Sequence, residues 1–161
     1  MKKITVLVLI LFFILPPRLS FSADVKIPNL STRYIIVMDS QSGRILFERN
    51  SRNVVPMAST TKIMTAIIAI ENCNLNDIVT VSKRASSIHG STVGLKYGQK
   101  ITMEELLYGL MLRSGNDCAI AIAEHISGSV EKFAELMNSK AFDIGAFNTH
   151  FSTPHGLDSD G

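Results

Sequence analysis

Ser59 and Lys62 are the first two side chains in this sequence whose types and spacing could carry out chemistry together. Residues three positions apart on a helix lie one turn from each other on one face. Pro56 and Ser59 are helix-start residues just before the apolar run 63–70, and burial there would lower the pKa of Lys62. A serine hydroxyl beside a lysine that sheds its proton is a nucleophile with its base. A helix cap followed by an ordinary lysine is the alternative, because Ser-x-x-Lys is a short pattern.

A second polar group, Ser114-Gly115-Asn116, falls between two apolar segments that we predict to be helices. A hydroxyl and a carboxamide two positions apart on a glycine-hinged loop can both point into one cleft. There the hydroxyl can relay a proton, and the amide can both donate to and accept from a peptide. The alternative is a helix–helix turn with Asn116 as the cap of the following helix.

The N-terminus has the pattern of a secretory signal. The basic start Met1-Lys2-Lys3 precedes the apolar run 4–15, which is shorter than the roughly 20 residues of a membrane span and suits a signal core. Small residues favour cleavage before Ala23, with an uncleaved anchor as the alternative. We therefore predict a signal peptide at 1–22 and one partial domain at 23–161, exported to the periplasm, the outer face of the cytoplasmic membrane or the cell wall.

The net charge excludes some partners. The chain has 16 basic and 14 acidic side chains, a formal charge of +2. Residues 1–22 hold three of the basic side chains and no acidic one, so without them the count is 13 against 14, or −1. The basic excess belongs to the signal, and nothing in the composition indicates nucleic acid or a strongly charged partner.

The remaining pattern predicts an α+β fold. Apolar runs at 34–38 and 44–48 flank a turn cluster, which indicates a β-hairpin. Helices are predicted at 59–71, 103–112, 117–126 and 130–143, and the stretch 74–99 is expected to be irregular. The helix at 59–71 is apolar on every side, so we expect it to be the central buried one. No later strands follow, and the fold therefore looks incomplete, since a lone hairpin is marginal.

Together the Ser59–Lys62 and Ser114–Asn116 groups, in an exported chain, resemble the penicillin-recognising serine hydrolases, which include penicillin-binding proteins and serine β-lactamases. The wider match, from about Tyr34 to the end, is to low-molecular-mass D-alanyl-D-alanine carboxypeptidases of the peptidase S11 type. The segments that carry it are Ser91-Thr92-Val93-Gly94-Leu95, Glu104-Glu105-Leu106-Leu107-Tyr108-Gly109-Leu110-Met111-Leu112, Gly115-Asn116-Asp117, Phe133-Ala134-Glu135-Leu136-Met137-Asn138 and Pro154-His155-Gly156-Leu157-Asp158. A class A β-lactamase is less favoured, because no Glu-x-x-Leu-Asn-like motif follows Ser114.

The resemblance implies a β-lactamase/transpeptidase-like fold and a serine carboxypeptidase that trims the terminal D-alanine from peptidoglycan stem pentapeptides. It makes Ser59 the acylated nucleophile, Lys62 its general base, Ser114 the proton shuttle to the leaving nitrogen and Asn116 a substrate-binding residue. The Ser59 amide would donate to the oxyanion, which is worth about 3–4 kcal/mol. β-Lactam antibiotics are the second implied ligand, and no cofactor or metal is expected. A DD-endopeptidase of the same family is the alternative.

The family's third motif, Lys-Thr-Gly or Lys-Ser-Gly on a later strand, has no match, and no Lys or Arg follows Lys140. We therefore expect a truncated or partial form, with an unpaired hairpin edge and an uncovered face on the central helix. Such a chain would be poorly folded and weakly active or inactive, and a non-catalytic remnant is the alternative. Membrane association would need a missing C-terminal anchor or an uncleaved signal.

The cysteines and histidines are expected to have no catalytic role. Two cysteines, Cys73 and Cys118, do not make a disulfide framework, and Cys118 lies in an apolar segment that favours a buried free thiol. His150, His155 and Asp158 lack a helix that would align them, so we do not expect a zinc site there.

Overall fold

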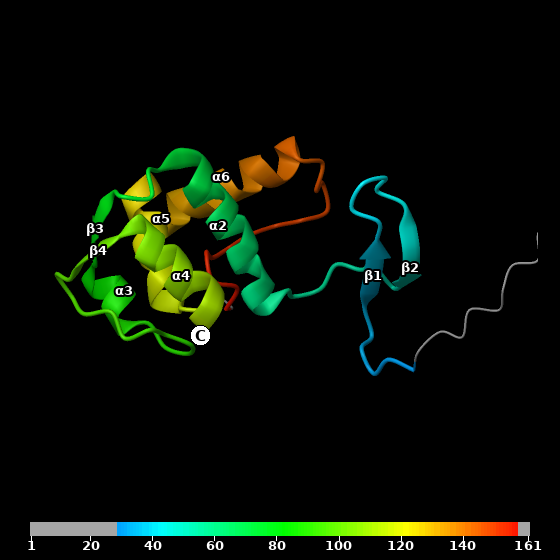
Figure 1. The fold of residues 1–161 in the computed structure, drawn as a ribbon, viewed down its shortest axis with the longest axis horizontal. Helices are drawn as coiled ribbons and strands as arrows, with labels where there is room; N and C mark the ends of the chain where they lie inside the picture. The colour runs from blue at the N-terminus through cyan, green and yellow to red at the C-terminus, as the bar shows by residue number, and fades with distance from the viewer. Residues whose placement is uncertain (1–28, 158–161) are drawn as a thin grey trace, which may run out of the picture. The chain divides into compact units, whose positions relative to one another are not determined.

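The computed structural model of this chain describes residues 29–157 and confirms the predicted α+β class. The chain divides into two compact units, Met1–Ser51 and Arg52–Gly161, whose elements are labelled in Figure 1. Among the described residues, no helix has the length and apolar character needed to cross a bilayer. The predicted signal peptide at 1–22 lies outside the described residues.

The first unit contains the predicted hairpin. Strand β1 (Ile35–Met38) pairs antiparallel with β2 (Ile45–Arg49), and the register shifts between Val37 and Met38. The Asp39 carboxylate accepts hydrogen bonds from the backbone N–H of Ser42 at 2.8 Å and from its hydroxyl at 2.5 Å, so the turn is closed by an acidic side chain. Apolar side chains of both strands are exposed: Ile36, Val37, Met38, Ile45 and Leu46.

Helices make most of the second unit, and their bounds agree with the predicted ranges within about two residues. A short 3₁₀ turn, η1 (Ala58–Thr60), leads into α2 (Thr61–Asn72), and α4 (Met103–Arg113), α5 (Asn116–Ser127) and α6 (Val130–Asp143) follow. Figure 1 shows these helices gathered in one bundle. Two of these helices begin with side-chain caps: Thr102 and Glu105 form a capping box on α4, and the Ser129 hydroxyl caps α6.

The central helix of this bundle is α5, and the prediction that the helix at 59–71 is buried on all sides is wrong. Helix α5 contacts α2, α4 and α6, the short helix α3 (Lys83–Ser87) and the strand β3 (Ile78–Thr80). Residues 118–123 are all at most 1% exposed. Its alternating small side chains let several neighbours approach closely. Helix α2 packs on α4, α5 and α6 through one face only. Its opposite face carries the exposed Ile63, Ile67 and Ile70, which agrees with the expected uncovered face.

The stretch 74–99 is more regular than predicted. Strand β3 (Ile78–Thr80) pairs antiparallel with β4 (Lys100–Thr102), and α3 (Lys83–Ser87) lies between them in sequence. The prediction of no later strands is therefore also wrong. Strands of three residues are too short to show an alternating pattern, although the buried side chains of Val79 and Val81 anchor this sheet to the core.

Candidate active site

Ser59 lies on a tight turn at the start of α2 and is exposed. The residue before it, Ala58, has a left-handed φ of +45°, a conformation that costs free energy for any residue with a Cβ. The capping alternative for Ser59 is wrong: Ser59 lies inside η1, and Thr60 occupies the N-cap position of α2 without a side-chain cap. The Ser59 hydroxyl therefore does not cap the backbone N–H groups at the start of the helix, and it is available for other contacts.

Lys62 lies one turn along α2 from Ser59 and is only 2% exposed. Its Nζ donates to the Ser59 Oγ at 3.2 Å and to the carbonyl oxygen of His155 at 3.0 Å. No carboxylate accepts a hydrogen bond from this Nζ among the described residues. Burial lowers the pKa of Lys62, since desolvation disfavours the charged form, as the sequence predicts.

Ser114 completes a cluster of side chains around the Ser59 hydroxyl. It ends α4 in a left-handed conformation with φ of +55°, and its hydroxyl donates to the Ser59 Oγ at 3.0 Å. The following Gly115 folds its N–H back to the carbonyl of Gly109. Three predicted site residues, Ser59, Lys62 and Ser114, therefore meet although Ser114 is 55 residues away in sequence.

Asn116, the fourth predicted residue, is buried at the start of α5. Its Nδ2 donates to the carbonyl of His89 at 2.8 Å, and its backbone N–H donates to the carbonyl of Ser91 at 2.7 Å. Gly90 lies between them with a φ of +88°, and a Cβ there would come within 2.8 Å of the Asn116 Nδ2. Asn116 thus fixes the 89–91 loop beside the site.

Asp117 is a residue to which the sequence analysis assigns no role of its own. Its buried carboxylate accepts from the backbone N–H groups of Val93 at 3.1 Å, Gly94 at 2.9 Å and Leu95 at 3.0 Å. Hydrogen bonds to a charged acceptor are stronger than neutral ones. Asp117 therefore ties the loop 93–95 to α5. In the sequence, the signal that could have indicated this role was a charged side chain directly after Ser-Gly-Asn and at the start of an apolar segment.

The segment 153–157 packs against the turn that presents Ser59. The carbonyl of Pro154 accepts from the Thr65 hydroxyl at 2.7 Å, and the next carbonyl binds Lys62. Gly156 has a φ of +79°, and a Cβ on it would overlap the carbonyl oxygen of Ala58. Only glycine fits this approach, so this segment is part of the scaffold of the site.

His155 is buried, with its Nδ1 accepting from the backbone N–H of Leu157 at 3.2 Å. Burial, followed by the charges of Lys62 and Arg84, lowers the pKa of His155 to about 4. The imidazole is therefore neutral at pH 7. His150 is exposed, and Asp158, the third residue considered for a zinc site, lies outside the described residues.

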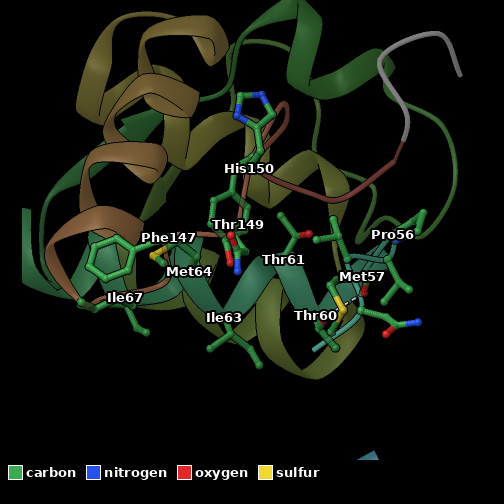
Figure 2. A pocket seen from close by; sticks show the side chains of 16 residues that line it. Pro56, Met57, Thr60, Thr61, Ile63, Met64, Ile67, Phe147, Thr149 and His150 are labelled. Carbon is green, nitrogen blue, oxygen red and sulfur yellow. Dashed lines mark hydrogen bonds between the residues drawn. The ribbon is translucent and has the colours of Figure 1, made fainter. Parts of the chain in front are cut away.

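A pocket of about 700 Å³ lies along the exposed apolar face of α2, which carries Ile63 and Ile67. Figure 2 shows its lining by Ile63, Ile67 and Phe147 together with Met57 and His150. Ser59, Lys62 and Ser114 are not among the lining residues. The pocket is therefore separate from the polar cluster and continues the exposed apolar face of α2.

Similarity to known proteins covers most of this chain. The family model described as D-alanyl-D-alanine carboxypeptidase matches residues 21–161. The chain is 38% identical over 131 residues to the D-alanyl-D-alanine carboxypeptidase DacF of Bacillus subtilis, a match covering 78% of this chain and 34% of the relative. The structure of the D-alanyl-D-alanine carboxypeptidase DacD of Francisella tularensis matches with a TM-score of 0.78 and 37% identity, over 86% of this chain and 36% of that one.

Penicillin binding protein 5 of Haemophilus influenzae matches with a TM-score of 0.78 and 34% identity, over 84% of this chain and 42% of that one. The chain thus spans between about a third and two fifths of the length of these three proteins. The neighbours confirm the transpeptidase-like fold that the sequence motifs predict. On the family match and the fold together, this chain belongs to the peptidase S11 family of D-alanyl-D-alanine carboxypeptidases.

Proposed function

We propose that the protein is a serine-type D-alanyl-D-alanine carboxypeptidase that removes the terminal D-alanine from peptidoglycan stem pentapeptides. The observation that carries this proposal is the geometry around the Ser59 Oγ. The buried Lys62 lies at 3.2 Å and Ser114 at 3.0 Å from it. A nucleophile within hydrogen-bond distance of a desolvated base is the arrangement that acyl transfer requires. Membership of the family supports the same reaction.

Acylation begins with proton transfer from the Ser59 hydroxyl to the Lys62 amine, whose unprotonated form is favoured by burial. The Ser59 Oγ attacks the carbonyl carbon of the penultimate D-alanine, and the bond from that carbon to the terminal nitrogen breaks. Ser114 passes the proton from Lys62 to the leaving nitrogen, and water then hydrolyses the Ser59 ester. General base catalysis of this kind contributes roughly 10²- to 10⁴-fold in rate.

Asn116 and the Ser59 amide are the proposed substrate contacts. The Nδ2 of Asn116 donates one of its two N–H groups to the carbonyl of His89, and its Oδ1 would accept from the substrate's peptide N–H. The backbone N–H of Ser59 would donate to the developing oxyanion, and one such donor is worth about 3–4 kcal/mol of barrier.

The substrate's terminal carboxylate needs a cation, and residues 1–161 contain no Lys-Thr-Gly or Lys-Ser-Gly sequence. We therefore propose slow turnover for these 161 residues alone. The location follows from the substrate: peptidoglycan stem peptides lie outside the cytoplasmic membrane, so the protein acts after export. β-Lactams would acylate the same Ser59 as analogues of the substrate.

Release of D-alanine from synthetic stem pentapeptides tests this function. The purified chain should release D-alanine slowly from a peptide ending in D-Ala-D-Ala and should not act on the matched peptide ending in D-Ala-L-Ala. Ser59→Ala should release none, while Ser127→Ala, on the last residue of α5, serves as a matched control.

Three results would count against the proposal. Equal release by the Ser59→Ala variant would remove Ser59 from the reaction. Cleavage of cross-linked muropeptide dimers in preference to pentapeptides would assign the DD-endopeptidase reaction instead. No release from any substrate would contradict the proposal for this chain.

A further inference from the structure

Three metal-ligating side chains lie together at the end of the helical bundle that does not hold Ser59. The Sγ of Cys73, a carboxylate oxygen of Asp77 and a ring nitrogen of His125 all lie within 4.8 Å of one another. Cys73 follows the last residue of α2, a helix of 12 residues and so roughly 18 Å long. The cluster is therefore one helix length from the Ser59 turn, and neither the pocket nor the polar cluster includes it.

Local structure fixes each of the three residues. The backbone N–H of Cys73 donates to the carbonyl of Ala69 at 3.0 Å as the C-cap of α2. The turn to Asp77 is closed twice, because the Asp77 carboxylate accepts from the Asn74 N–H and the Asp77 N–H donates to the Asn74 carbonyl, both at 3.0 Å. His125 lies in the last turn of α5. Side chains on such elements can hold a ligand geometry.

The three ligand types match one metal well. Thiolate, imidazole and carboxylate are the ligands that Zn²⁺ takes, at about 2.0–2.3 Å. Ligand atoms at such distances on a tetrahedron are roughly 3.5 Å apart, so small side-chain rotations would close the 4.8 Å spread. Burial and the neighbouring Asp77 raise the pKa of the Cys73 thiol, and a divalent cation between the two groups would offset both effects.

We propose that Cys73, Asp77 and His125 form a zinc site with water as the fourth ligand. On binding, the Cys73 thiol releases its proton to solvent and its sulfur bonds to the metal, with no change of oxidation state. The ion would join the C-terminal end of α2, the turn 74–77 and the end of α5. The site lies apart from Ser59 and does not depend on the function proposed there.

Cobalt substitution and zinc titration of the purified chain test this site. Co²⁺ should give a thiolate-to-cobalt charge-transfer absorption at one ion per chain, and Zn²⁺ should displace it stoichiometrically. Cys73→Ser should abolish the absorption. His125→Ala should weaken Zn²⁺ binding by more than about 100-fold, because even outer partners of metal ligands cost roughly 10- to 100-fold. His150→Ala is the matched control for loss of an exposed histidine.

Folding of each variant is checked by far-ultraviolet circular dichroism, and the altered side chains are outside the fully buried core. Zn²⁺ should also raise the Tm of the wild-type chain but not that of Cys73→Ser, since a ligand that binds only the folded state stabilises it. Three results would each overturn the proposal. They are equal Zn²⁺ binding by the wild-type chain and Cys73→Ser, a loss of Zn²⁺ binding in His150→Ala as large as that in His125→Ala, and no Zn²⁺ binding by the wild-type chain.

Discussion

At the scale of single residues, the site depends on a lysine that the fold keeps away from water. Lys62 is 2% exposed, and its hydrogen bonds go to a hydroxyl and a backbone carbonyl. Neither partner carries a negative charge that would stabilise an ammonium group. Burial therefore lowers the pKa of Lys62 and makes the neutral amine available as a base at a lower pH than in an exposed lysine.

Replacement of Lys62 separates its role as a base from its role as a cation. Lys62→Met and Lys62→Arg should both slow acylation of Ser59 by at least about 100-fold, because arginine stays protonated and cannot accept a proton. The measurement is the rate of labelling by a fluorescent penicillin over long incubations. Lys132→Met, an exposed lysine on α6, is the control. A Lys62→Arg variant that acylates as fast as the wild-type chain would show that only the positive charge matters.

The lowered pKa of His155 predicts that the folded chain loses stability in acid. In the folded chain its pKa is about 4 against an ordinary 6.5, so the unfolded chain holds more protons between these values. Stability therefore falls as the pH drops from 6.5 to about 4. The difference between the folded and unfolded pKa values corresponds to a loss of roughly 3 kcal/mol in the free energy of unfolding without solvent screening. With solvent screening the expected loss is roughly 2 kcal/mol. His155→Asn keeps an acceptor for the Leu157 N–H and should lack this loss.

Urea unfolding of the wild-type chain and His155→Asn at pH 7 and pH 4 measures the difference. Other groups titrate in both proteins, so the comparison isolates His155. The same pH dependence in both proteins would mean that the buried imidazole does not titrate as described.

At the scale of elements, the Ser59 turn is held from the other side by the segment 153–157. Gly156 and Gly145 have nearly the same left-handed φ, +79° and +81°. A Cβ on Gly156 would overlap the Ala58 carbonyl oxygen, whereas a Cβ on Gly145 would meet no atom within 4 Å. The two glycines thus separate the cost of the backbone conformation from the cost of the close approach.

Alanine at these two positions gives a matched pair. Gly145→Ala should lower the free energy of unfolding by about 1–2 kcal/mol, the cost of a left-handed conformation for a residue with a Cβ. Gly156→Ala should cost roughly 1–3 kcal/mol more, because the overlap forces a backbone shift, and it should also slow Ser59 acylation. Urea unfolding and penicillin labelling measure the two effects. Equal costs for the two variants would mean that the contact with Ala58 does not constrain the turn.

The sequence could predict those contacts of the site that join residues close together in the chain. Ser59 and Lys62 lie three positions apart on one helix, so their proximity follows from helix geometry alone. The contact between Ser59 and Ser114 spans 55 residues and came only from the resemblance to a family. The partners of Asp117 are backbone N–H groups at 93–95, which no side-chain pattern reveals. The strands β3 and β4 were missed because each has three residues.

At the scale of the whole molecule, apolar surface is unevenly covered. Helix α5 is enclosed, while α2 exposes 52% of Ile63 and 62% of Ile70. The hairpin strands also expose apolar side chains. The predicted uncovered face of the helix at 59–71 follows from its sequence, because an all-apolar helix needs layers on several sides. That α5 takes the central place was not predictable from its pattern, since both helices are rich in apolar residues.

The central claim is that Ser59 is the acylated nucleophile and that the cluster around it is assembled within these residues. Site-mapped mass spectrometry after prolonged incubation with excess penicillin tests it most directly. We predict a slow mass increase of one penicillin, confined to Ser59, absent in Ser59→Ala and strongly slowed in Lys62→Met. Labelling of another residue, labelling that persists in Ser59→Ala, or no labelling of the folded chain would contradict the account.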